Sequence, residues 1–137
     1  MYKKVFLVLC ILGFIAVSFA ADKPVAEKVY AYYFHGSVRC STCYKLEQYS
    51  KEAIENNFKS QLASGKLEFR VINIEEKANA HFINDYQLYT KALVLSLVKD
   101  GRQAKSKNLD KIWQLVGSKD KFVEYIKVEL ANFLKGP

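Results

Sequence analysis

The chain has 137 residues, a formal net charge of +7, 50% hydrophobic residues and 26% charged residues. This length fits one compact domain, and the apolar fraction excludes a disordered chain, because such chains lack the apolar surface that offsets the entropy of ordering. Three cysteines are too few for a domain held by several disulfides, and too few for a Cys₄ zinc site. The positive charge raises the question of a nucleic-acid or membrane partner, which the positions of the charges decide.

The first twenty residues have the pattern of a secretory signal peptide. Two lysines lie among the first four residues, residues 5–21 carry no charge, and the small residues Ser18 and Ala20 precede the expected cleavage site. The uncharged run is shorter than the roughly 20 apolar residues of a typical spanning helix. We therefore predict a signal peptide over residues 1–20, a periplasmic or secreted protein, and no stable membrane insertion after cleavage. The alternative is an N-terminal membrane anchor.

Strand and helix patterns alternate along the rest of the chain. Residues 21–27 are polar and predict a tether to a single domain over residues 28–137. Apolar spacing and turn residues predict the following elements: strand 28–34, helix 43–62, strand 67–74, helix 78–89, strands 92–98 and 103–107 joined by a turn at 99–102, a short helix 108–116, and a last helix capped by Ser118. The order β-α-β-α-β-β-α predicts an α/β fold.

Two cysteines remain after removal of the signal, and both lie where the first long helix begins. Cys40 and Cys43 are about one helical turn apart, so their sulfurs can reach disulfide distance. The N–H groups at the helix start and the positive charge of Arg39 favour a thiolate at Cys40. We predict that Cys40 attacks, that Cys43 resolves the mixed disulfide, and that His35 is a candidate proton shuttle.

Two other interpretations of the cysteine pair stay open at this point. The pair could be an inert structural disulfide, although a four-residue ring constrains the unfolded chain little. The pair could also carry a soft metal such as Cu(I), with His35 as a third ligand. Heavy-metal-binding domains have a different element order, β-α-β-β-α-β. We predict no resident metal and no cofactor.

The element order and the position of the cysteine pair resemble the thioredoxin fold over nearly all of residues 28–134. More narrowly, residues 32–43 and 45–47, with residues 85–91 and 107–113, are similar to the thioredoxin-like family of nitrophenyl compound nitroreductase subunits (ArsF type). The resemblance implies a three-layer α/β/α sandwich with a mixed central sheet. It also implies association with a reductase system. The disulfide chemistry, in contrast, is indicated by the cysteine motif itself.

The chain departs from ordinary thioredoxins in three places. Residues 39–43 read Arg-Cys-Ser-Thr-Cys, where thioredoxins usually have Trp-Cys-Gly-Pro-Cys. Residues 28–39 contain no acid, whereas thioredoxins carry a buried acid there that assists proton transfer to the resolving cysteine. Residues 90–93 lack the proline that thioredoxins place in cis before the third strand to hold substrate backbone. We therefore expect substrate binding that differs from that of thioredoxins.

Basic residues cluster around the predicted hairpin, at Lys99, Arg102, Lys105, Lys107 and Lys111. They straddle a turn and an edge strand, where charge protects the strand from unwanted pairing. We therefore predict no nucleic-acid partner. The expected function is thiol–disulfide exchange with a protein dithiol or disulfide partner, with soft-metal carriage as the alternative. The sequence predicts no particular oligomeric state.

Overall fold

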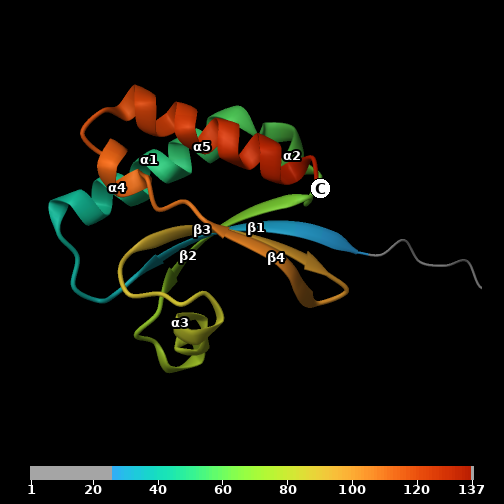
Figure 1. Cartoon of the computed structure of the whole chain (residues 1–137), viewed down its shortest axis with the longest axis horizontal. Coiled ribbons are helices and arrows are strands. Elements are labelled where there is room, and N and C mark those ends of the chain that lie inside the picture. Colours follow the sequence, from blue (N-terminus) through green and yellow to red (C-terminus); the bar gives the residue numbers. More distant parts are fainter. Residues whose placement is uncertain (1–25, 137) are drawn as a thin grey trace, which may run out of the picture.

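The computed structural model describes residues 26–136, so the predicted signal segment, its cleavage site and most of the predicted tether lie outside the described residues. A four-stranded sheet separates two groups of helices (Figure 1). The strands are β1 (Glu27–His35), β2 (Leu67–Asn73), β3 (Ala92–Lys99) and β4 (Arg102–Asn108). The helices are α1 (Ser41–Asn57), α2 (Lys59–Ala63), α3 (His81–Asp85), α4 (Ile112–Leu115) and α5 (Lys119–Leu134), with a 3₁₀ turn at Lys77–Asn79.

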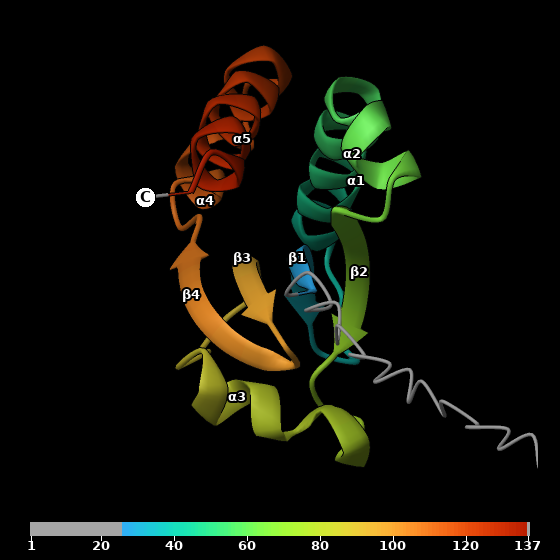
Figure 2. The same ribbon diagram turned by 90° about the vertical axis from the view of Figure 1, so that its right-hand side faces the viewer.

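The sheet is mixed, with the strand order β2-β1-β3-β4. Strand β1 pairs in parallel with β2 and antiparallel with β3, and β3 pairs antiparallel with β4. Helices α1, α2, α4 and α5 cover one face of the sheet, and α3 lies on the other (Figure 2). This arrangement is a thioredoxin-like three-layer α/β/α sandwich with a mixed central sheet, as the sequence predicts.

Two apolar cores fill the sandwich, one on each face of the sheet. Successive side chains of β1 alternate between them, so Tyr33 joins the larger core under α1 and α5, while Phe34 joins the smaller core beside α3. Both side chains are fully buried, as expected for a strand that has a neighbour on each side and a core on each face. Helix α1 buries Leu46, Ala53 and Ile54 in the larger core, and α5 buries Phe122, Ile126, Leu130 and Phe133.

Three predicted helices differ from the observed ones. The predicted helix 108–116 is reduced to the four residues of α4, because Asn108 still pairs with Val94 as the last residue of β4. The predicted helix 43–62 is interrupted at Phe58, whose backbone leaves helical geometry (φ −128°, ψ 36°) and whose side chain is buried in the larger core. The predicted helix 78–89 is a 3₁₀ turn followed by the five residues of α3. It ends early because Gln87 takes a positive φ of 52°, which turns Leu88 back into the smaller core. Apolar spacing continues through both breaks and therefore does not reveal them.

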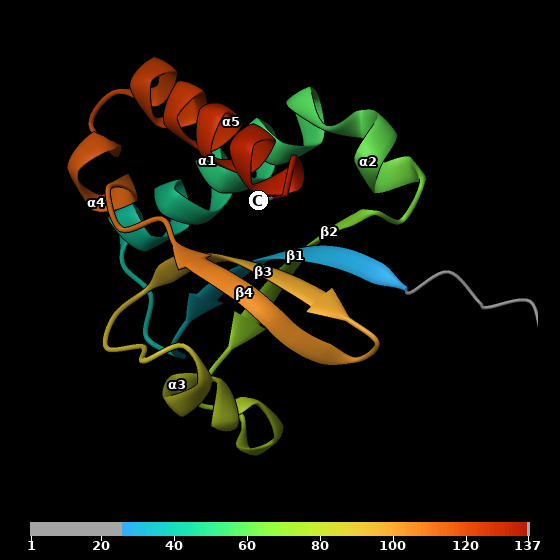
Figure 3. The ribbon, with the colours of Figure 1, turned by 45° about the vertical axis from the view of Figure 1, so that its right-hand side comes forward.

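Strand β4 forms one edge of the sheet (Figure 3). All of its residues are exposed. Two of its basic side chains have local partners: Lys107 pairs with Glu129 of α5, and the ammonium of Lys105 lies 5.1 Å from the ring centre of Phe133. Such charges suit a solvated edge strand. Across residues 26–136, none of the helices is long and apolar enough to cross a membrane.

Candidate functional site

The cysteine pair lies at the end of the sheet where β1 ends and α1 begins. Cys40 is the N-cap residue of α1, with extended backbone (φ −99°, ψ 169°), and Cys43 lies in the first turn of the helix. The two Cα atoms are 5.1 Å apart and the two sulfurs lie at disulfide distance. The start of the helix therefore brings the two sulfurs together through local geometry alone.

The two cysteines have different environments. Cys40 is exposed, whereas the Cys43 side chain is only 1% exposed. The backbone N–H of Cys43 donates a hydrogen bond to the Cys40 sulfur at 3.3 Å, and the first turn of α1 contains no acidic residue. After reduction, this N–H and the positive end of the helix dipole favour negative charge on Cys40. A partner disulfide arriving from solvent meets Cys40 first.

A buried tyrosine of strand β1 forms a hydrogen bond with the backbone of the cysteine pair. The Tyr33 hydroxyl donates a hydrogen bond to the backbone carbonyl of Cys43 at 2.9 Å. Burial raises the pKa of Tyr33 to about 12, while the nearby Arg39 lowers this pKa and Glu47 raises it. The sequence pattern places Tyr33 in a buried strand but does not predict this hydrogen bond. The contact depends on how α1 packs over the sheet.

We expect Tyr33 to make the protein less stable at alkaline pH. An unfolded tyrosine ionises near pH 10.0, whereas folded Tyr33 stays neutral to about pH 12. Its contribution to the free energy of unfolding is therefore complete below pH 10 and is lost as the pH rises toward 12. Urea unfolding at neutral pH and near pH 11 measures this loss, which we expect to be smaller in Tyr33→Phe than in the wild type.

A matched control for this experiment is Tyr89→Phe, because the Tyr89 side chain is 92% exposed. Tyr89→Phe is expected to lose as much stability between the two pH values as the wild type does. The pKa of Tyr32 is also raised to about 12 by burial, so Tyr33→Phe retains part of the alkaline effect. An identical loss in Tyr33→Phe and in the wild type contradicts the prediction.

Arg39, predicted to stabilise the Cys40 thiolate, is held by other groups. Its guanidinium pairs with the Glu47 carboxylate and stacks over the Tyr44 ring, 4.4 Å from the ring centre. Within residues 26–136, neither cysteine sulfur is a hydrogen-bond partner of Arg39, and its buried Nε has no partner. The sequence pattern does not single out Glu47 as a site residue, although its position four residues after Cys43 places it on the same helix face. The role of Arg39 at the thiolate stays a prediction.

His35 ends strand β1 and lines a hollow of about 240 Å³ together with Glu75 and Lys91. Its Nδ1 lies 2.8 Å from the carbonyl oxygen of Gly36. The Glu75 carboxylate accepts a hydrogen bond from the backbone N–H of Ser37 at 2.9 Å, and hydrogen bonding from Ser37 lowers the pKa of Glu75. Glu75 thus anchors the loop that leads to the cysteines. The part of His35 in proton transfer stays a prediction, because its hydrogen bond goes to the backbone.

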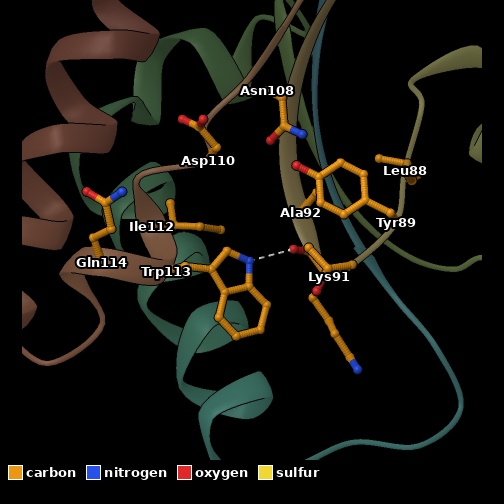
Figure 4. Close-up of a pocket in the computed structure, with 10 residues that line it drawn as sticks. Leu88, Tyr89, Lys91, Ala92, Asn108, Asp110, Ile112, Trp113 and Gln114 are labelled. Atoms are coloured by element: carbon orange, nitrogen blue, oxygen red, sulfur yellow. Dashed lines mark hydrogen bonds between the residues drawn. The ribbon is translucent and has the colours of Figure 1, made fainter.

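A second hollow, of about 220 Å³, lies where the chain enters β3 (Figure 4). Tyr89, Lys91, Asp110 and Trp113 are among its lining residues, and the Trp113 indole N–H donates a hydrogen bond to the Lys91 carbonyl at 2.9 Å. None of the peptide bonds between residues 26 and 136 is cis. A side-chain hydrogen bond from α4 therefore holds the corner before β3, where thioredoxins have a proline.

No metal centre is evident beside the cysteines. In the part of the chain that the structure describes, no three His, Cys, Asp or Glu side chains come together in a group that could hold a metal ion. The arrangement supplies two sulfurs that can form and break a disulfide, with the positive end of a helix behind the exposed one. Its chemistry is that of thiol–disulfide exchange.

The chain is similar, at low sequence identity, to proteins of known structure. No protein-family model matches the chain, and no curated protein matches it. A thioredoxin of Fasciola hepatica is similar at 16% identity, over 66% of this chain and 79% of that chain, with a TM-score of 0.39. A structure described only as that of a malarial protein is similar at 11% identity, over 67% and 97% of the two chains, with a TM-score of 0.39. The fold assignment follows from strand order, strand direction and helix placement.

Proposed function

We propose that this protein is a thiol–disulfide oxidoreductase that acts on a protein partner outside the cytoplasm. The observation that carries the proposal is the asymmetry of the cysteine pair: an exposed Cys40 at the helix N-cap accepts a hydrogen bond from the N–H of a buried Cys43. Exposure and a stabilised thiolate are the properties of an attacking sulfur, and burial suits a resolving one.

Exchange proceeds in two steps that balance in atoms and electrons. The Cys40 thiolate attacks one sulfur of a partner disulfide, so that a Cys40–partner bond forms, the partner's own S–S bond breaks, and the released partner thiolate takes a proton from solvent. Cys43 then loses its proton and attacks the Cys40 sulfur, which releases the second partner thiolate. Two electrons pass to the partner and the Cys40–Cys43 disulfide remains. The reverse sequence oxidises a partner dithiol.

Two further parts of the proposal rest on sequence patterns. The basic, apolar and small-residue pattern of residues 1–20 supports a periplasmic or secreted protein. The similarity of residues 32–43 to the ArsF-type family supports a role as the redox partner of a reductase system. In that role the cysteine pair passes electrons to or from another subunit through the same two steps.

The reduction potential of the pair tests the proposal. We expect a value more oxidising than the roughly −270 mV of thioredoxin, because a stabilised thiolate favours the reduced form. The purified protein is equilibrated with mixtures of reduced and oxidised glutathione, quenched with acid, alkylated, and weighed by mass spectrometry. A value at or below about −270 mV contradicts the predicted potential. A cysteine pair that exchanges with no glutathione mixture overturns the proposed function.

A further inference from the structure

One ion pair of this protein is more buried than the others, and it lies beside the cysteines. The side chains of Arg39 and Glu47 are 15% and 26% exposed. In every other ion pair within residues 26–136, the basic side chain is at least 33% exposed. Charges that are shielded from water act on their neighbours more strongly than exposed charges do, because water screens them less.

The pair brackets the redox motif along the chain. Arg39 directly precedes Cys40, and Glu47 follows Cys43 by one helical turn. Both charges act on the hydroxyl of Tyr33, since Arg39 lowers and Glu47 raises the pKa of that group. The same hydroxyl is bonded to the carbonyl of Cys43. Arg39 and Glu47 thus act with opposite signs on a hydroxyl that is bonded to the backbone of the buried cysteine.

We propose that Glu47 is a positioning residue of the redox site. Glu47 holds the Arg39 guanidinium against the Tyr44 ring and balances its positive charge. In this way Glu47 sets how strongly the Cys40 thiolate is stabilised. An arginine paired with a carboxylate exerts a weaker field on a neighbouring anion than an unpaired arginine does. The helix start and the N–H of Cys43 then supply the remaining stabilisation of the thiolate. The consequence for exchange rests on the proposed function, but the effect on the Cys40 thiol does not.

Other ionisable groups at this end of the sheet belong to different contacts. His35, Glu75 and Lys91 line the hollow beside the loop before Cys40, and Asp110 lines the other hollow together with Trp113. Substitutions at Arg39 and Glu47 leave these groups in place. Opposite changes at the two positions therefore separate the contribution of the pair from that of the surroundings.

The test measures the rate of Cys40 alkylation by iodoacetamide against pH in the reduced protein. Glu47→Gln leaves Arg39 uncompensated, so the thiolate fraction below the midpoint is expected to rise about tenfold, which lowers the midpoint by about one pH unit. Arg39→Gln leaves Glu47 uncompensated, and the midpoint is expected to rise by a similar amount. In the double variant the two shifts cancel, and the midpoint returns to the wild-type value.

Equilibration with glutathione gives a second readout of the same effect. Glu47→Gln is expected to favour the reduced pair by about tenfold, which corresponds to about 30 mV toward a more oxidising potential. Arg39→Gln is expected to shift the equilibrium in the opposite direction. A merely structural role for the ion pair would lower stability in both variants but would not give opposite shifts.

The matched control is Glu52→Gln, which removes an equal charge from the same helix, where Glu52 pairs with Lys119 on α5. It is expected to leave the alkylation midpoint unchanged. If Glu47→Gln does not fold, Glu47→Asp and Arg39→Gln carry the test: the aspartate keeps the charge and should retain the wild-type midpoint, while Arg39→Gln should raise it.

Two kinds of failure are distinguishable. A Glu47→Gln midpoint that stays constant or rises overturns the inference, even if the wild type exchanges disulfides efficiently. Opposite midpoint shifts in a protein that exchanges with no disulfide support the inference and overturn the proposed function. The alkylation experiment therefore measures the effect of the Arg39–Glu47 ion pair on the Cys40 thiol without any partner protein.

Discussion

The Cys40→Ser variant is expected to lose disulfide exchange by about a thousandfold or more, since removal of a reacting nucleophile commonly has effects of this size. The remaining sulfur belongs to Cys43, which is 1% exposed and cannot meet a partner disulfide without opening of the helix start. The reduction of a small protein disulfide, followed in an excess of dithiol, measures the loss. A variant that keeps more than a tenth of the wild-type rate contradicts the assignment of Cys40 as the attacking sulfur.

The Cys43→Ser variant should behave differently, because it keeps the attacking sulfur and lacks the resolving one. The mixed disulfide on Cys40 then persists, so the variant can be used to capture partners from a cell-envelope extract. The double variant Cys40→Ser/Cys43→Ser is the control and is expected to capture nothing through a disulfide. Covalent capture by Cys40→Ser but not by Cys43→Ser would reverse the assigned roles.

The largest expected effect on stability comes from Phe122→Ala. Phe122 is fully buried in the larger core, where its ring meets that of Tyr49 edge to face at 5.5 Å between ring centres. The truncation removes apolar contacts and leaves a cavity between α5 and α1, so we expect the free energy of unfolding to fall by about 3–5 kcal/mol. Urea unfolding followed by circular dichroism measures this change.

The matched control on the same helix is Val128→Ala, because the Val128 side chain is 47% exposed. Its expected cost is within about 0.5 kcal/mol. Similar losses in the two variants would show that α5 does not pack on α1 as described. Because α1 carries Cys40 and Cys43, Phe122→Ala is also expected to loosen the helix that positions the cysteine pair.

The fold follows largely from local sequence patterns. Apolar runs and turn residues predict the four strands and their order along the chain. The cysteine spacing predicts two sulfurs one turn apart at the start of a helix. These features depend on residues close together in the chain, so the sequence carries them directly. The predicted helix 43–62 is wrong at Phe58. There the side chain is buried in the larger core, and the backbone leaves helical geometry.

The surroundings of the site could not be predicted in the same way. The contact between Tyr33 and the Cys43 carbonyl joins a strand to a helix, and the hydrogen bond from Trp113 to Lys91 joins residues 22 positions apart. Such contacts are set by the packing of elements against one another, which residue spacing does not encode. The Arg39–Glu47 pair likewise joins a residue before the helix to one inside it, so helix spacing does not predict it.

The net charge of +7 predicted little about function, whereas its distribution in space is informative. The sequence alone determined that two cysteines stand at the start of a helix after a buried strand, because that placement is a local property of the chain. Only the tertiary structure decided that Arg39, the charged residue next to Cys40 in the chain, is bound to a carboxylate. The field at the exposed sulfur depends on that partner, and partners are chosen by the three-dimensional packing of the side chains.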